Sequence, residues 1–216
     1  MTKNNQKTLC TAICMLAAFV LWSIAIQIID IKAIGPQNSS VGFATLNQLI
    51  HNLTGVNMSL YTLTDWLGLV PIGFAMGFAL LGLIQLIKRK HILKVDFSIL
   101  ALGGFYIVVF AMYIFFELHV VNYRPILING ILEASYPSST TMLVMCIMPT
   151  AIMQFDNRIK NETLKKLISV FIIVFILFMV IGRILSGVHW ITDIIGGAML
   201  SCGLVRLYSF VSKLKF

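Results

Sequence analysis

The sequence predicts an all-α integral membrane protein, because of its composition, its apolar runs and the placement of its basic residues. Of the 216 residues, 59% are hydrophobic and only 11% are charged, and the mean hydropathy is +0.94. A typical soluble domain carries about 25% charged residues. Backbone polar groups in lipid must be satisfied within the chain, so helices are the expected spanning elements. We expect residues 1–216 to form one membrane domain.

Six apolar runs predict six transmembrane helices packed as a bundle. A run of about 20 residues crosses a roughly 30 Å hydrocarbon core at about 1.5 Å per residue. The predicted spans are residues 8–31, 66–87, 97–116, 140–155, 167–185 and 190–211. The first run lacks a small-residue cleavage site, so we expect it to be retained as a span. The fourth run is short and contains Pro149, which favours a kink or a partly buried helix.

The connection between the first two spans carries apolar residues at helical spacing. They are Phe43, Leu46, Leu49, Ile50 and Leu53. This pattern predicts a short amphipathic helix lying on the membrane surface. The alternative is a loop segment that packs on the bundle.

The basic residues predict the orientation in the membrane. Six spans place both termini on one side, and 13 of the 16 Lys and Arg residues lie on that side. The exceptions are Lys32, Arg124 and Arg183. The positive-inside rule therefore predicts a multi-pass plasma membrane protein with both termini in the cytoplasm. Because the basic residues follow topology, the net charge of +8 does not indicate a nucleic-acid partner.

The four cysteines do not indicate a disulfide framework or a metal site. None belongs to a Cys-x-x-Cys pair, and all lie in apolar segments, where they serve as packing residues. They are Cys10, Cys14, Cys146 and Cys202.

Residues 182–193 hold Arg183, His189 and Asp193 in an otherwise apolar region. Charge at membrane depth costs roughly 2.5–3.5 kcal/mol per residue, so it indicates function. If a helix begins near His189, Asp193 lies on the same face and can hold one ring nitrogen, which leaves the other free as a nucleophile. Arg183 precedes a glycine-containing break and offers a fork of N–H donors that suits a phosphate. The alternative is a snorkelling arginine and a His–Asp pair that only caps a helix.

Two further pieces precede the fourth span. Arg124-Pro125 comes first, followed by Tyr136-Pro137-Ser138-Ser139-Thr140. Pro137 suits the start of a helix, where Ser138, Ser139 and Thr140 would offer hydroxyls and unpaired backbone N–H groups to an anion. The alternative is ordinary helix capping by serine or threonine. The predicted topology places these residues, with Arg183, His189 and Asp193, on the outer face.

The order and spacing of these pieces resemble the type 2 phosphatidic acid phosphatase family. Its three motifs are Lys-x6-Arg-Pro, Pro-Ser-Gly-His and Ser-Arg-x5-His-x3-Asp. The resemblance extends from about Glu117 to Asp193, and the third motif is its most specific part.

The resemblance implies a role for each matching residue. His189 would be the nucleophile that forms a phosphohistidine, and Asp193 would orient it. Arg124 and Arg183 would bind phosphate oxygens, and the Ser138-Ser139-Thr140 segment would complete the phosphate cradle. No metal or other cofactor is implied, because the arginines supply the positive charge.

The chain also departs from the family motifs. Glu117 stands at the lysine position, Ser139-Thr140 replaces Gly-His, and Gly182 replaces the serine of the third motif. The missing histidine protonates the leaving oxygen in the family. Glu117, with a raised pKa, or His119 are candidate replacements as proton donor.

We therefore expect a metal-independent membrane lipid phosphatase with a lipid phosphate or diphosphate as substrate. A phosphate leaving group hardly needs a proton, so the missing histidine favours a polyprenyl diphosphate such as undecaprenyl diphosphate. A lipid phosphotransferase would share the same intermediate. A non-catalytic phospholipid-binding relative is the remaining alternative.

Overall fold

The computed structural model describes residues 3–214, and regular structure in this part of the chain is helical. Strand-like pairing there is confined to isolated bridges. The long helices are α1 (Lys3–Ile26), α4 (Leu69–Arg89), α5 (Phe97–Leu118), α6 (Ser139–Asp156), α7 (Glu162–Leu185) and α8 (Ile191–Val211). The short ones are α2 (Ala44–Thr54), α3 (Met58–Leu67) and the 3-10 turns η1 (Pro36–Asn38) and η2 (Ile92–Lys94). The predicted all-α class is confirmed, although residues 1–2 and 215–216 of the expected domain lie outside the description.

Five stretches of the described chain are long and apolar enough to cross a membrane. They are Lys3–Ile26, Met58–Arg89, Phe97–Leu118, Glu162–Leu185 and Ile191–Val211. Helix α6 is not among them, since it carries several polar side chains that are buried against other helices, including Thr140, Thr141, Thr150 and Gln154. The fourth predicted span, residues 140–155, therefore stays a prediction, and with it the total of six spans.

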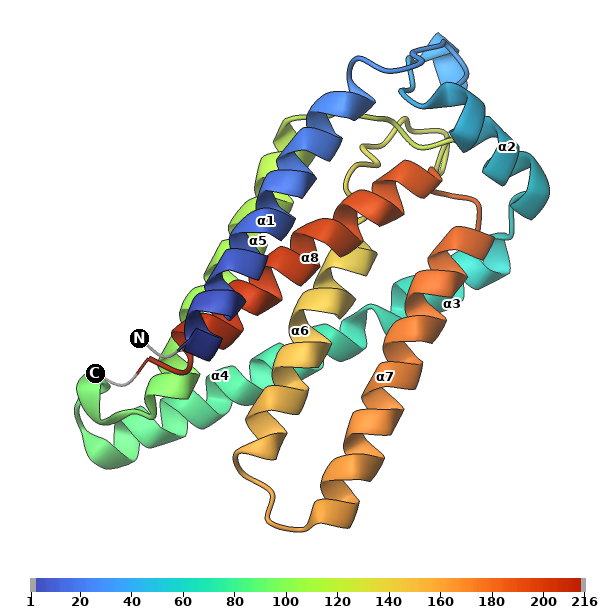
Figure 1. The fold of residues 1–216 in the computed structure, drawn as a ribbon. Coiled ribbons are helices and arrows are strands. Elements are labelled where there is room, and N and C mark those ends of the chain that lie inside the picture. Colours follow the sequence, from blue (N-terminus) through green and yellow to red (C-terminus); the bar gives the residue numbers. More distant parts are fainter. Residues whose placement is uncertain (1–2, 215–216) are drawn as a thin grey trace.

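The long helices run alongside one another between two ends of the molecule (Figure 1). The start of α1 and the end of α8 lie at one end, together with the connection from α4 to α5. The connection from α5 to α6, the helix α2 and the connection from α7 to α8 lie toward the opposite end. The residues of the three predicted motifs belong to this second end, at residues 117–140 and 182–193.

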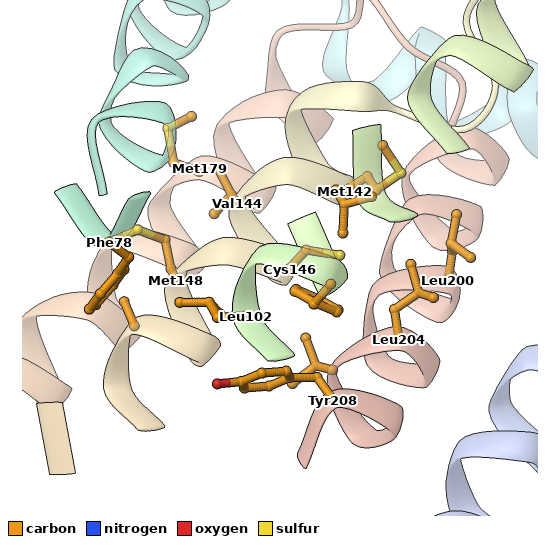
Figure 2. Packing of buried hydrophobic residues seen from close by; sticks show 14 of the residues in the cluster. Phe78, Leu102, Met142, Val144, Cys146, Met148, Met179, Leu200, Leu204 and Tyr208 are labelled. Carbon is orange, nitrogen blue, oxygen red and sulfur yellow. The ribbon is translucent and has the colours of Figure 1, made fainter. Parts of the chain in front are cut away.

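Helix α6 forms the centre of the bundle, and α4, α5, α7 and α8 pack on it. Figure 2 shows its side chains among those of the four neighbours. The labelled residues are Met142, Val144, Cys146 and Met148 of α6, with Phe78, Leu102, Met179, Leu200, Leu204 and Tyr208 around them. The outer faces of α1, α4, α5 and α7 carry exposed leucine, isoleucine and phenylalanine side chains, as expected of surfaces that meet lipid.

The first helix ends at Ile26, five residues before the predicted end of the first span. Gly42 approaches this end so closely that a β-carbon there would lie 1.6 Å from the carbonyl oxygen of Ile26. Asp30 adopts a left-handed backbone conformation, and its carboxylate accepts a hydrogen bond of 2.7 Å from the backbone N–H of Thr45. The prediction of helix over 27–31 was therefore wrong, because the chain turns there toward α2.

A helix, α2, forms where the amphipathic one was predicted, and Leu46, Leu49 and Leu53 are exposed on it. Its position on the membrane surface stays a prediction. Its buried Asn47 faces α8, where it exchanges hydrogen bonds with Thr192. Helix α3 was not predicted, because residues 58–65 were assigned to the connection. The second apolar stretch thus begins at Met58, and Gly68 separates α3 from α4.

Candidate active site

A hairpin-like loop before α6 carries Arg124. Asn129 and Gly130 both have positive φ angles, of 51° and 79°, which is the conformation that Asn-Gly adopts in tight two-residue reversals. The reversal pairs Ile128 with Ile131 through isolated bridging. As a result the backbone N–H of Arg124 donates to the carbonyl of Glu133 at 3.1 Å.

The same loop brings Asn122 next to Ser135, whose backbone N–H donates to the Asn122 carbonyl at 2.9 Å. Both side chains reach Asp193 of α8. Asn122 Nδ2 donates to Asp193 Oδ1 at 3.3 Å, and Ser135 Oγ donates to Asp193 Oδ2 at 2.5 Å. The loop is therefore fastened to the first turn of α8 by a carboxylate that is fully buried.

The connection from α7 to α8 carries His189. Gly187 has a φ of 65°, and a β-carbon there would lie 1.8 Å from the carbonyl oxygen of Gly55. The backbone N–H of Asn57 donates to the Ser186 carbonyl at 2.9 Å. The turn between α2 and α3 thus packs directly on the connection that presents His189.

Helix α8 begins at Ile191, so His189 precedes the helix. The condition for a shared helical face, a helix that already includes His189, is therefore not met. Asp193 Oδ2 accepts a hydrogen bond of 3.0 Å from the backbone N–H of Trp190 and so caps the helix. Asp193 therefore has the helix-capping role that was one of the two alternatives from the sequence, in addition to any catalytic role.

Ser135 lies between the imidazole and the carboxylate. His189 Nδ1 is 4.0 Å from Asp193 Oδ2, but only 3.0 Å from Ser135 Oγ. The single hydroxyl hydrogen of Ser135 is donated to Asp193, so Nδ1 must carry the hydrogen that Ser135 accepts. This arrangement leaves the lone pair on Nε2. Sequence reasoning missed Ser135, since it belongs to none of the three motifs.

His189 Nε2 is buried and has no hydrogen-bond partner in the described chain. Burial lowers the pKa of His189 well below its usual value, and the positive charges of Arg124 and Arg183 lower it further. The imidazole is therefore neutral at pH 7. A neutral ring with one nitrogen hydrogen-bonded and the other free has the form of a nucleophile.

The two arginines lie close to each other and to His189, and both are buried. Arg183 Nη2 donates to Thr140 Oγ1 at 2.6 Å, and its Nη1 donates to Thr64 Oγ1 at 3.3 Å. The Nε atom of Arg183 and the Nη1 atom of Arg124 are buried, and neither has a hydrogen-bond partner among residues 3–214. Buried N–H donors without partners are costly, so the two guanidinium groups are suited to bind an anion.

Each arginine also has a carboxylate at the edge of the site. Arg124 Nε lies 3.1 Å from Glu133 Oε2, although without hydrogen-bond geometry. Arg183 Nη2 lies 3.4 Å from Asp65 Oδ1. Both carboxylates are much more exposed than the arginines that they face.

The Ser138-Ser139-Thr140 segment lies at the start of α6, as predicted. The backbone N–H of Ser138 is occupied, because it donates to the Asp193 carbonyl at 3.0 Å, and its hydroxyl accepts from Thr141. Thr140 faces Arg183. The hydroxyl of Ser139 has no hydrogen bond within residues 3–214.

The two candidate proton donors differ in position. Glu117 is exposed at the end of α5 and lines a small cavity that also contains His189, Ser135 and Ser139. His119 is exposed, and its ring stacks on Phe115 of its own helix. The structure therefore brings Glu117, and not His119, toward the candidate nucleophile.

A mostly apolar groove of about 530 Å³ runs from the site between α4, α5 and α6. Its polar end holds Asp65, Ser139 and Thr140. Its apolar part includes Ile72, Phe110 and Leu143, along with other side chains of the three helices. Among residues 3–214, no group of three His, Cys, Asp or Glu side chains could hold a metal ion.

We expect the acidic limb of the pH–rate profile to lie well below pH 6.5. If His189 is the nucleophile, its neutral imidazole is the reactive form, and the pKa of His189 is below its usual value of 6.5. The folded protein should also lose stability as the pH falls below about 6.5. The reason is that an unfolded chain takes up a proton on this histidine near that pH, while the folded chain does not. Initial rates and unfolding temperatures between about pH 5 and about pH 8 check both points. A loss of rate that begins above pH 6.5 would contradict the assignment.

The fold and the site define a helical membrane protein that gathers a histidine, an aspartate and two arginines at one end of its bundle. The model of the PAP2 superfamily matches residues 72–215, and the chain belongs to this superfamily. The resemblance to type 2 phosphatidic acid phosphatases is therefore confirmed.

A solved structure shares the fold. It is the first transmembrane PAP2 type phosphatidylglycerolphosphate phosphatase from Bacillus subtilis, with a TM-score of 0.54 and 18% sequence identity. The match covers 92% of this chain and 94% of that one. A comparison with curated proteins gave no match. Family and fold together support a membrane lipid phosphatase.

Proposed function

We propose that the protein hydrolyses a lipid phosphate or diphosphate through a phosphohistidine on His189. The observation that carries this proposal is the state of the imidazole. Its Nδ1 is held by Ser135 and, through it, by Asp193, while its Nε2 is free beside two buried arginines. A structural histidine at a helix end has no need of a free ring nitrogen next to two positive charges.

In the first step Nε2 attacks phosphorus, the P–N bond forms, and the bond from phosphorus to the leaving oxygen breaks. The ring gains positive charge, and Nδ1–H donates to Ser135 while Ser135 donates to Asp193. Arg124 and Arg183 bind the phosphoryl oxygens, where charge develops. In the second step water attacks phosphorus, the P–N bond breaks, and phosphate and neutral His189 are released.

The groove supports a lipid substrate, because it is mostly apolar and ends at Thr140, which holds Arg183. Thr140 stands where the family has its acid, and a threonine hydroxyl does not protonate a leaving alkoxide. A departing phosphate, whose second pKa is about 6 in monoesters, needs little help. We therefore propose a polyprenyl diphosphate as the preferred substrate, with Glu117 as the proton donor for any leaving group that requires one.

The proposed position in the membrane follows from the two ends of the bundle. Helix α6 crosses the membrane as the fourth of six spans, the termini lie in the cytoplasm, and the site faces outward in the plasma membrane. Exposed Leu49 and Leu53 hold α2 on the membrane surface beside the site. Cysteine labelling from outside intact cells tests this. A single cysteine at Asn129 should react, and one at Lys160 should not.

Purified protein in detergent should release phosphate faster from undecaprenyl diphosphate than from phosphatidic acid or phosphatidylglycerophosphate. The reason is the missing acid at Thr140. Malachite-green detection of phosphate from each lipid at matched concentration gives the comparison. Faster cleavage of either monoester refutes the diphosphate preference. Release from none of the three, with retained binding of phosphate, would favour the non-catalytic alternative.

A further inference from the structure

Helix α3 turns one face toward Arg183, and it lies before residue 72, where the match to the family model begins. Tyr61, Thr64 and Asp65 share this face, because residues three and four apart are neighbours on a helix. The Tyr61 carbonyl accepts from Arg183 Nη1 at 3.4 Å. Thr64 and Asp65 supply the two further contacts described above.

Gly182 allows α3 to come this close to α7. A β-carbon at Gly182 would lie 2.7 Å from Thr64 Cγ2. Any larger residue there, including the serine of the family motif, would force the Thr64 side chain, which accepts a hydrogen bond from Arg183, to shift. The glycine at position 182, where the family motif has a serine, therefore makes room for the close approach of α3.

The ring of Tyr61 contacts both guanidinium groups. The Cζ atom of Arg183 is 4.9 Å from the ring centroid, and that of Arg124 is 5.7 Å from it. Both distances fall within about 6 Å, the range of a cation–π interaction. Two buried like charges repel each other, and a ring that attracts both is a means of holding them together before phosphate arrives.

We propose that Tyr61 is a positioning residue that fixes the pair formed by Arg124 and Arg183 in its phosphate-binding arrangement. The proposal rests on the proposed function for its link to turnover, but not for its link to anion binding. Tyr61 contacts the arginines and no reacting atom, so its loss should weaken phosphate affinity more than it slows the chemical step. The ring, and not the hydroxyl, carries the effect.

Three variants separate these contributions. Tyr61→Phe keeps the ring, Tyr61→Leu removes it, and Leu63→Ala changes an exposed residue elsewhere on the same helix. We expect Tyr61→Leu to raise KM and the inhibition constant of inorganic phosphate about 10-fold, with kcat changed less than about 3-fold, in line with a modest cation–π contribution. Tyr61→Phe and Leu63→Ala should stay within about twofold of the parent.

Fluorinated phenylalanines at position 61 give a second measurement that leaves the shape nearly unchanged. Each added fluorine weakens the negative face of the ring, so phosphate affinity should fall stepwise with fluorine number. Unchanged phosphate affinity in Tyr61→Leu or across the fluorinated series overturns the proposal, as does a Tyr61→Phe defect equal to that of Tyr61→Leu.

Thermal-shift binding of inorganic phosphate keeps this test separate from the proposed function, because it needs no turnover. If the parent binds phosphate but cleaves no lipid, the proposed function fails. The Tyr61 proposal then stands or falls on the binding data of the variants alone.

Discussion

Replacing His189 by alanine should reduce phosphate release by roughly 10³-fold or more, the scale seen when a nucleophile is removed. The variant keeps the arginines and the groove, but it has no nitrogen to attack phosphorus. Steady-state release from the best lipid substrate measures the loss. His91→Ala is the matched control, because His91 is exposed and lies in the connection between α4 and α5 at the other end of the bundle.

The same variant tests the intermediate. Parent protein quenched during turnover of ³²P-labelled lipid should carry an acid-labile, base-stable phosphoryl group, and His189→Ala should carry none. Retention of more than about one tenth of the parent rate would show that another group attacks phosphorus. If the labelled parent protein transfers its phosphoryl group to an alcohol in preference to water, the protein is a phosphotransferase.

Arg183→Lys should lower kcat/KM by about 10²- to 10³-fold, which is the effect of removing one preorganised donor from a developing charge. The charge is kept, but the planar fork is lost. A lysine ammonium that donates to Thr140 and Thr64 has at most one N–H left for a phosphate, whereas the guanidinium has five donors in all. The side chain is only 1% exposed, so water cannot replace the missing donors.

Arg206→Lys provides the control for this substitution, because Arg206 is exposed toward the far end of α8. Its kcat/KM should match that of the parent. If Arg183→Lys retains more than about a third of the parent value with an unchanged unfolding temperature, a single positive charge suffices and the fork has no role.

Much of the fold could be predicted from local pattern. Apolar runs locate helices because lipid demands them, and five of the six predicted spans correspond to helices that meet the length and composition of a span. Helix α3 escaped prediction because Tyr61, Thr64 and Asp65 interrupt its apolar character. Those residues contact Arg183, which lies more than 100 positions later in the chain. A local pattern cannot indicate such a distant contact.

The candidate site was predictable in its motif residues but not in the way that they are connected. Spacing placed His189 four residues before Asp193, and it suggested a direct contact through a helix that begins later. Ser135 fills the gap of 4.0 Å between them. The Asn129-Gly130 pair is a turn pattern that could have indicated the loop reversal, and hence the approach of Ser135 to Asp193.

The carboxylates of Glu133 and Asp65 bear on how phosphate would bind to the site and leave it. Each already faces one of the two guanidinium groups from the more exposed edge. In the proposed mechanism, an arriving phosphate would compete with these two carboxylates for the guanidinium groups. We expect the same two pairs to re-form as the product leaves, which would limit how tightly free phosphate is retained and favour repeated turnover.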